Sequence, residues 1–167
     1  MQDFQELVGK LKMEPHPEGG FYKETYRSKN DISPESLWPA AAGGRSYSTA
    51  IYFLLHGDNF SAFHRIKADE MWHFYGGKTL LLHMIHPSGE YECIRIGSDV
   101  LNDEHPQFVV PAGVWFASET EDKSSFSFVG CTVSPGFDFR DFEMPGRDDL
   151  IRLFPQHHEV IAKLTRL

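Results

Sequence analysis

The side chains of this chain with the clearest chemical potential are His64 and Glu70, six positions apart between Gly57 and Gly77. A carboxylate beside an imidazole fixes the tautomer of the ring and raises its basicity, so such a pair can move protons. When both groups are buried, they also satisfy each other's hydrogen-bonding needs. We therefore expect both side chains in one pocket, as a general acid/base couple or as the polar part of a binding site.

Strand parity predicts which neighbours share that pocket. If Glu70 points into the interior, Trp72 and Phe74 point there too, because alternate residues of a strand share a face. By the same rule His64 shares its face with three neighbours: Phe60, Ala62 and Ile66. Aromatic rings fill a core and also stack on planar ligands. The first ligand-binding candidates are therefore Ile66, Trp72 and Phe74.

Short strands must position these side chains. Turn signals such as His56-Gly57-Asp58-Asn59 and Pro87-Ser88-Gly89 separate apolar runs about every ten residues, which is typical of an antiparallel sandwich or barrel. We predict strands over residues 21–27, 45–55, 60–66, 71–75, 78–86, 91–96, 107–110, 114–118 and 125–133. Apolar spacing predicts short helices over residues 3–12, 148–153 and 156–166, and residues 28–44 have the composition of a long loop.

The order of these residues resembles the two signature motifs of the cupin superfamily. His64, Glu70 and Gly77 match its first motif, and Pro111-Ala112-Gly113 matches its second. Longer segments, including Pro17-Glu18-Gly19-Gly20-Phe21-Tyr22, resemble an uncharacterised branch of RmlC-like cupins, and the resemblance covers residues 4–145. It implies an all-β double-stranded β-helix, or jelly roll, with short helices at both ends. We expect one domain over residues 1–167, with its barrel core at about 18–140 and a helical tail at about 146–167.

The metal ligands of the family are only half present. The resemblance implies a second histidine where Ile66 stands and a third where Phe116 stands. The remaining imidazole and carboxylate form a weak site, because affinity depends on the number and geometry of the ligands. We expect no bound metal and no other cofactor, and this weakens a metal-dependent dioxygenase as the function.

The resemblance implies three more pocket candidates. Trp115 stands close after the Pro111-Ala112-Gly113 turn, near the barrel mouth of related folds, and Phe116 follows it. RmlC-type epimerases pair a histidine and a carboxylate with a tyrosine, and Tyr52 could supply that phenol. Arg27 and Arg45 could clamp an anionic ligand group, although a salt bridge within an acidic protein is the simpler interpretation.

Composition limits the partners. The 167 residues carry 16 Lys+Arg against 24 Asp+Glu, a formal net charge of −8, which disfavours nucleic acid and anionic membranes because both reward a basic face. The longest apolar runs are too short to span a bilayer, and residues 1–10 do not resemble a secretory signal. Cys93 and Cys131 are expected to be reduced, which favours a cytoplasmic location.

Two function hypotheses follow for the pocket. One is a metal-independent epimerase or isomerase acting on a sugar-like or nucleotide-linked small molecule, with His64 moving the proton and Glu70 orienting it. The other is a non-catalytic module that binds or senses a small ligand through the same residues. The resemblance also implies a homodimer.

Overall fold

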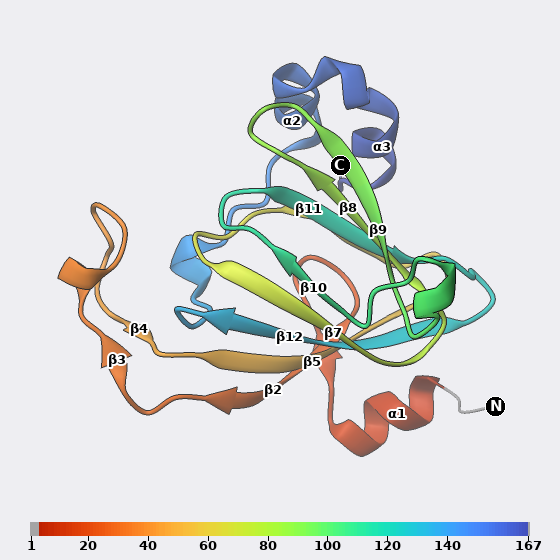
Figure 1. Cartoon of the computed structure of the whole chain (residues 1–167), viewed down its shortest axis with the longest axis horizontal. Coiled ribbons are helices and arrows are strands. Elements are labelled where there is room, and N and C mark those ends of the chain that lie inside the picture. Colours follow the sequence, from red (N-terminus) through yellow and green to blue (C-terminus); the bar gives the residue numbers. More distant parts are fainter. Residues whose placement is uncertain (1–3, 167) are drawn as a thin grey trace.

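The computed structural model describes residues 4–166, which form two antiparallel sheets facing each other (Figure 1). The larger sheet runs in the order β1 (Glu14–Pro15), β2 (Phe21–Arg27), β5 (Thr49–His56), β12 (Phe126–Ser134), β7 (Asp69–Gly77) and β10 (Gln107–Val110). The smaller runs in the order β6 (Phe60–His64), β11 (Trp115–Thr120), β8 (Leu80–Ile85) and β9 (Tyr91–Ile96). Most neighbouring strands are distant in sequence, as in a jelly roll.

Shorter elements surround the two sheets. The pair β3 (Asp31–Ile32) and β4 (Arg45–Ser46) forms a small projecting sheet, at the left of Figure 1. The helices are α1 (Phe4–Leu11), α2 (Arg147–Leu153) and α3 (His158–Lys163). Short 3-10 turns are η1 (Pro34–Ser36), η2 (Val100–Asn102), η3 (Phe139–Asp141) and η4 (Pro155–His157). No helix among the described residues is long and apolar enough to cross a bilayer.

Two apolar clusters lie on opposite faces of the smaller sheet, because alternate residues of its strands point to opposite sides. The inner cluster fills the space between the sheets and includes Phe53, Leu82, Trp72 and Phe116. The outer cluster packs the smaller sheet against α2 and α3, and it includes Trp115. The barrel is thus filled from the inside and covered by helices on one side.

The predicted all-β jelly roll with terminal helices is confirmed. Strands 21–27, 91–96 and 107–110 have the predicted bounds, whereas the predicted strand 45–55 is divided into β4 and β5. The predicted helix 3–12 is observed as Phe4–Leu11, and residue 3 lies outside the described residues. The predicted helix 156–166 is shorter, because a 3-10 turn precedes α3.

A bulge in β6 corrects one prediction of facing. The pairing of β6 with β11 runs from Phe116↔His64 to Ser118↔Ser61, so β6 holds one extra residue. Beyond the extra residue the alternation is reversed. Phe60 therefore packs with the outer cluster, and the prediction that it shares the face of His64 is wrong.

Candidate functional site

A cavity of about 340 Å³ opens on the inner face of the larger sheet. This volume lies within the range of pockets that hold small molecules. Its walls come from four strands of the larger sheet, β2, β5, β7 and β12, and from His64 of β6. The turn before β2 and the segment after β12 complete them. Its ionisable lining includes His16, Glu18, Glu24, Arg27, His64 and Glu70. Rings of Tyr22, Phe137 and Phe139 contribute an aromatic wall.

Glu18 is brought to the cavity by the tight turn before β2. Gly19 and Gly20 have φ angles of 115° and 77°, a region that favours glycine. The Glu18 carbonyl accepts a hydrogen bond from the Ala62 N–H at 2.9 Å, which ties the turn to β6. The Glu18 side chain consequently lies beside His64.

Both ring nitrogens of His64 are engaged. Nδ1 lies 2.7 Å from the carbonyl oxygen of Ala62, and Nε2 lies 3.0 Å from Oε2 of Glu18. A carbonyl oxygen only accepts, so Nδ1 carries a proton. The buried His64 is thus held between two oxygen acceptors.

Electrostatics make this contact an ion pair. Burial by itself would lower the pKa of His64, but the adjacent Glu18 carboxylate, together with Glu70 and the Ala62 carbonyl, outweighs it and the pKa is raised. Burial by itself would raise the pKa of Glu18, but His64, together with His16 and Ser61, outweighs it and the pKa is lowered. His64 is therefore an imidazolium whose two protons point to Ala62 and Glu18. It has no free nitrogen to act as a base.

Glu70 is the acid of the cavity whose pKa is raised into the neutral range. Its side chain is buried, and burial raises the pKa of Glu70 to about 7, while His64 opposes and Glu18 adds to the shift. The buried Cys131 donates a hydrogen bond to it, and burial raises the pKa of that thiol well above its usual range. Within residues 4–166, no basic side chain lies within ion-pair distance of the Glu70 carboxylate.

His16 contributes a neutral imidazole to the same wall. Its Nδ1 accepts a hydrogen bond from the Glu18 backbone N–H at 3.2 Å, so its proton resides on Nε2. Burial lowers the pKa of His16, with Glu18 opposing the shift. The Tyr22 ring lies edge-on at 4.6 Å. His16 can therefore offer a ligand one neutral N–H donor.

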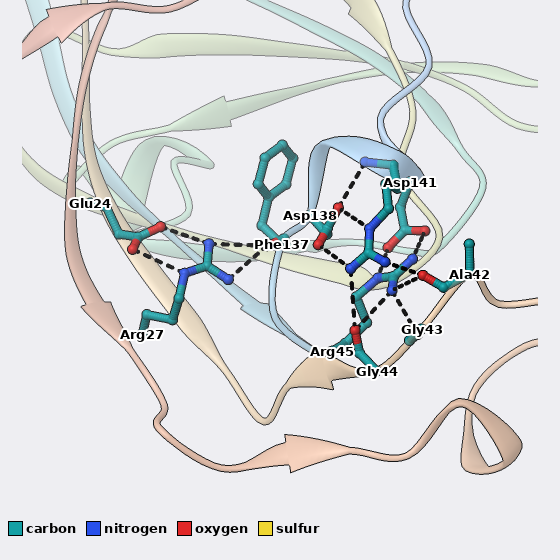
Figure 2. A network of polar contacts seen from close by, with 10 residues as sticks. Glu24, Arg27, Ala42, Gly43, Gly44, Arg45, Phe137, Asp138 and Asp141 are labelled. Carbon is teal, nitrogen blue, oxygen red and sulfur yellow. Dashed lines mark hydrogen bonds and ion pairs between the residues drawn. The ribbon is translucent and has the colours of Figure 1, made fainter.

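The two arginines proposed as an anion clamp form salt bridges instead (Figure 2). Arg27 lines the cavity, where its guanidinium bonds Glu24 at 2.8 and 3.0 Å and the Phe137 carbonyl at 3.1 Å. Arg45 is buried against Asp141, with contacts of 2.6 and 2.8 Å, and also bonds backbone carbonyls of residues 42–44. The simpler of the two interpretations made from the sequence holds for both.

Three of the predicted ligand-binding residues, Phe116, Trp72 and Phe74, pack in the inner apolar cluster. Phe116 lies 4.1 Å from the His64 ring and 6.3 Å from the Trp72 ring, between centroids. Trp72 is almost fully buried, and its Nε1 has no hydrogen-bond partner among the described residues. Phe74 packs on the same inner cluster. Trp72 and Phe74 share the interior face of Glu70 on β7, and Phe116 points into the same interior from β11. None of the three lines the cavity.

The other three predicted ligand residues lie elsewhere. Trp115 packs in the outer cluster under α2 and α3, with the Arg65 guanidinium 4.3 Å from its ring centroid. Tyr52 faces away from the interior, in contact with the rings of Tyr75 and Phe128. Ile66 lines a separate cavity of about 300 Å³. The structure therefore does not bring Tyr52, Ile66 or Trp115 to the cavity that holds Glu70.

Sequence reasoning missed His16, Glu18 and Tyr22. The segment Pro17-Glu18-Gly19-Gly20-Phe21-Tyr22 contained a signal, because two consecutive glycines beside a carboxylate indicate a turn in which the backbone approaches another element closely. Which strand the turn would approach depends on the tertiary fold, and local spacing does not specify it.

The cavity does not fit the metal that many cupins bind. Ile66 and Phe116 supply no donor atom, and both nitrogens of His64 are already engaged. Within residues 4–166, no three His, Cys, Asp or Glu side chains are arranged to hold a metal ion. We accordingly derive no chemical step through a metal.

Comparisons with known proteins agree with this architecture. The model of a family described as Cupin superfamily (DUF985) matches residues 5–145. An uncharacterised protein of Saccharomyces cerevisiae is 31% identical over 159 residues, covering 89% of this chain and 79% of that protein.

Solved structures extend the similarity. A protein of Shewanella oneidensis has 42% identity and a TM-score of 0.90, with 99% of both chains covered. A hypothetical protein of Leishmania major has 32% identity and a TM-score of 0.91, with 99% of this chain and 100% of that one covered. Oxalate decarboxylase of Bacillus subtilis aligns with a TM-score of 0.53 at 14% identity, over 90% of this chain and 36% of that one, a likeness of fold alone.

Proposed function

We propose, from the premise that this chain belongs to the DUF985 family of the cupin superfamily, that it binds a small organic molecule in the cavity beside Glu70. The observation that carries the proposal is a buried carboxyl group that lines a cavity of about 340 Å³ without an ion-pair partner among the described residues. A buried carboxyl group has several acceptor sites, and the Cys131 thiol fills only one of those of Glu70. A ligand that supplies a further hydrogen bond or an opposite charge offsets part of the cost of burial.

Each part of the cavity has a role in this proposal. Glu70 forms the polar contact that orients the ligand, and the neutral His16 offers a second. Tyr22 and Phe137 cover the apolar part of the ligand, since aromatic rings bury large areas. The Glu18–His64 ion pair fixes the polar end of the cavity.

Proton transfer is a second candidate function, and the pKa of Glu70 favours it. A carboxyl group with a pKa of about 7 is partly ionised near neutral pH, which suits a general acid or base. An epimerase or isomerase working beside a carbonyl group would use Glu70 to move the proton. His64, with both nitrogens engaged, would take no part in the proton transfer and would hold Glu18 in place.

A binding assay combined with isotope exchange tests both candidates. Small carbonyl compounds, including keto-sugars, are screened for a rise in melting temperature, and hits are incubated with the protein in heavy water. Stabilisation without deuterium incorporation is the expected result for a binding module, and incorporation that disappears in Glu70→Gln is expected for an isomerase. Glu159→Gln, an exposed change on α3, is the matched control. If no compound stabilises the protein and none exchanges, both candidates fail for this class of ligand.

The homodimer and the cytoplasmic location are proposals as well. The first rests on the resemblance to cupins, and the second on the interpretation of Cys93 and Cys131 as reduced thiols. Light scattering on the purified full chain gives the mass in solution, and twice 19.1 kDa is the expected value.

A further inference from the structure

The charges around the cavity cancel in pairs, with one exception. Glu18 pairs with His64 at 3.0 Å, and Glu24 pairs with Arg27 at 2.8 Å. Asp138, which also lines the cavity, pairs with Arg140 at 2.7 Å. Among the acids that line the cavity in residues 4–166, Glu70 alone lacks a basic side chain within 4 Å.

From this pairing we propose that the cavity takes a small organic cation, an ammonium group carried on a ring or apolar chain, with the Glu70 carboxylate as its counter-ion. The inference rests on the proposed function, that a small molecule binds in this cavity. It adds the chemical class of that molecule.

The same pairing disfavours an anionic ligand. Arg27, the one arginine among the described lining residues, already bonds Glu24 and the Phe137 carbonyl. The cationic His64 directs its protons at Ala62 and Glu18. A bound carboxylate or phosphate would meet Glu70 without a free cation to offset the repulsion. An ammonium group would meet an acceptor that lacks an ion-pair partner.

The aromatic wall suits the same class of ligand. Rings of Tyr22, Phe137 and Phe139 line the cavity together with the apolar side chains of Ile51 and Val133. The faces of such rings attract cations as well as covering apolar surface. A ligand with a charged end at Glu70 and an apolar body would use both parts of the lining.

Binding of a cation should release a proton near neutral pH. The groups that face Glu70 are His64 on β6, Glu18 on the turn before β2, and Cys131 on β12. Burial and the Glu18 charge keep part of the Glu70 population protonated at pH 7. An ammonium group favours the carboxylate, so the proton leaves the carboxyl oxygen for the buffer when the cation binds.

Calorimetry with matched compounds tests the inference. Three sets share a shape and differ in charge: benzylamine, benzyl alcohol and benzoate; 2-phenylethylamine, 2-phenylethanol and phenylacetate; cyclohexylmethylamine, cyclohexylmethanol and cyclohexanecarboxylate. We expect the amine of at least one set to bind more tightly than its alcohol, and the carboxylate to bind most weakly. Titrations in phosphate and in Tris should differ in heat at pH 7, because the two buffers take up the released proton with different enthalpies.

Variants locate the contact. In Glu70→Gln, binding of the amine should weaken roughly thirtyfold or more, as when one partner of a buried charge pair is truncated. The alcohol should bind Glu70→Gln as well as it binds the wild type, and Glu159→Gln should leave all binding unchanged. If Glu70→Gln fails to fold, the proton release of the wild type still decides the question.

The outcomes separate this inference from the proposed function. Alcohols or carboxylates that bind as tightly as the amines, amine binding that is unchanged in Glu70→Gln, or heats that are equal in both buffers would overturn the cation while leaving a ligand-binding cavity. Failure of all nine compounds to bind would count against both.

Discussion

At the scale of single residues, the three acidic and basic groups at the base of the cavity have different protonation states for physical reasons. Glu18 and His64 are close enough for their attraction to exceed the cost of burying both charges, so each stays ionised. Glu70 has no such neighbour within ion-pair distance among the described residues, and burial favours its neutral form. The group that can change its charge near neutral pH is therefore Glu70.

This difference predicts a pH dependence of stability that belongs to Glu70. Its pKa is about 7 in the folded protein against an ordinary value of 4.5, so the folded state binds the proton more tightly. The stabilisation is complete below about pH 4.5 and is lost as pH rises through 7, by roughly 2–3 kcal/mol between pH 5 and pH 8. Chemical denaturation of the wild type and Glu70→Gln at several pH values measures it.

Other groups also titrate between pH 5 and pH 8, so the stability of the wild type alone does not isolate Glu70. The test is therefore the difference in stability between Glu70→Gln and the wild type. The free energy of unfolding of Glu70→Gln minus that of the wild type should rise steadily from pH 5 to pH 8. A difference that stays level over this range would show that Glu70 has an ordinary pKa in the folded protein.

The Glu18–His64 ion pair predicts strong energetic coupling. His64→Leu leaves the Glu18 carboxylate buried without its partner, and we expect a loss of about 3–5 kcal/mol. Glu18→Leu with His64→Leu together should cost less than the sum of the single changes, because no unpaired charge remains buried. Urea denaturation of the four proteins gives the coupling energy.

An exposed pair is the control for that cycle. Asp149 and Arg152, 3.1 Å apart on α2, are both largely exposed, and their coupling should stay below about 1 kcal/mol. Strictly additive effects for Glu18 and His64 would mean that the two side chains do not form an ion pair in solution.

At the scale of elements, the turn before β2 determines where Glu18 lies. A Cβ atom at Gly19 would collide with the Phe60 backbone, and the φ of Gly19 is 115°. Gly113 also has a positive φ, of 80°, but a Cβ there meets no atom within 4 Å. An alanine at Gly113 would therefore introduce backbone strain alone, whereas an alanine at Gly19 would introduce both strain and a steric clash.

We predict that Gly113→Ala costs about 1 kcal/mol, from backbone strain alone. Gly19→Ala should cost at least about 2 kcal/mol more, since the turn must move away from β6 and loses the contact from Ala62 to Glu18. Thermal and urea denaturation measure both losses. Equal losses for the two variants would show that the close approach to Phe60 has no energetic consequence.

The strands also show how far the facing of side chains can be predicted from the sequence. Alternation along β7 correctly placed Glu70, Trp72 and Phe74 on one face, because that strand pairs regularly over these residues. The same reasoning was wrong for Phe60, because an extra residue in β6 reverses the alternation and leaves no signal in the residue types.

Prediction of the site was more limited than prediction of the strands. His64 and Glu70 line the cavity, but the partner of His64 is Glu18, which lies 46 positions away in sequence. Trp115 and Phe116 are adjacent and therefore face opposite sides of β11, so a motif that includes both cannot place both in the pocket. Contacts between distant turns and strands depend on the tertiary fold, which local patterns do not encode.

At the scale of the whole molecule, the C-terminal helices form one structure with the barrel. The helices α2 and α3 lie beside the strands of the smaller sheet (Figure 1). Leu150, Ile161 and Leu164 are fully buried and pack in one cluster with Phe63 and Trp115. Without α2 and α3, the outer face of the smaller sheet would present a large apolar surface to water. We therefore expect the helices and the barrel to unfold together.

Two leucines of α2 test this expectation. Leu150 is 0% exposed and Leu153 is 63% exposed, so Leu150→Ala should cost about 2–5 kcal/mol and Leu153→Ala no more than about 0.5 kcal/mol. Tryptophan fluorescence reports both clusters through Trp72 and Trp115, and far-ultraviolet circular dichroism reports the strands. In Leu150→Ala, both signals should shift to the same lower midpoint, because removing one contact under the helices weakens a single cooperative unit. If an early transition appeared while the barrel signal kept its wild-type midpoint, the tail would be a separate unit and the chain would contain more than one folding domain.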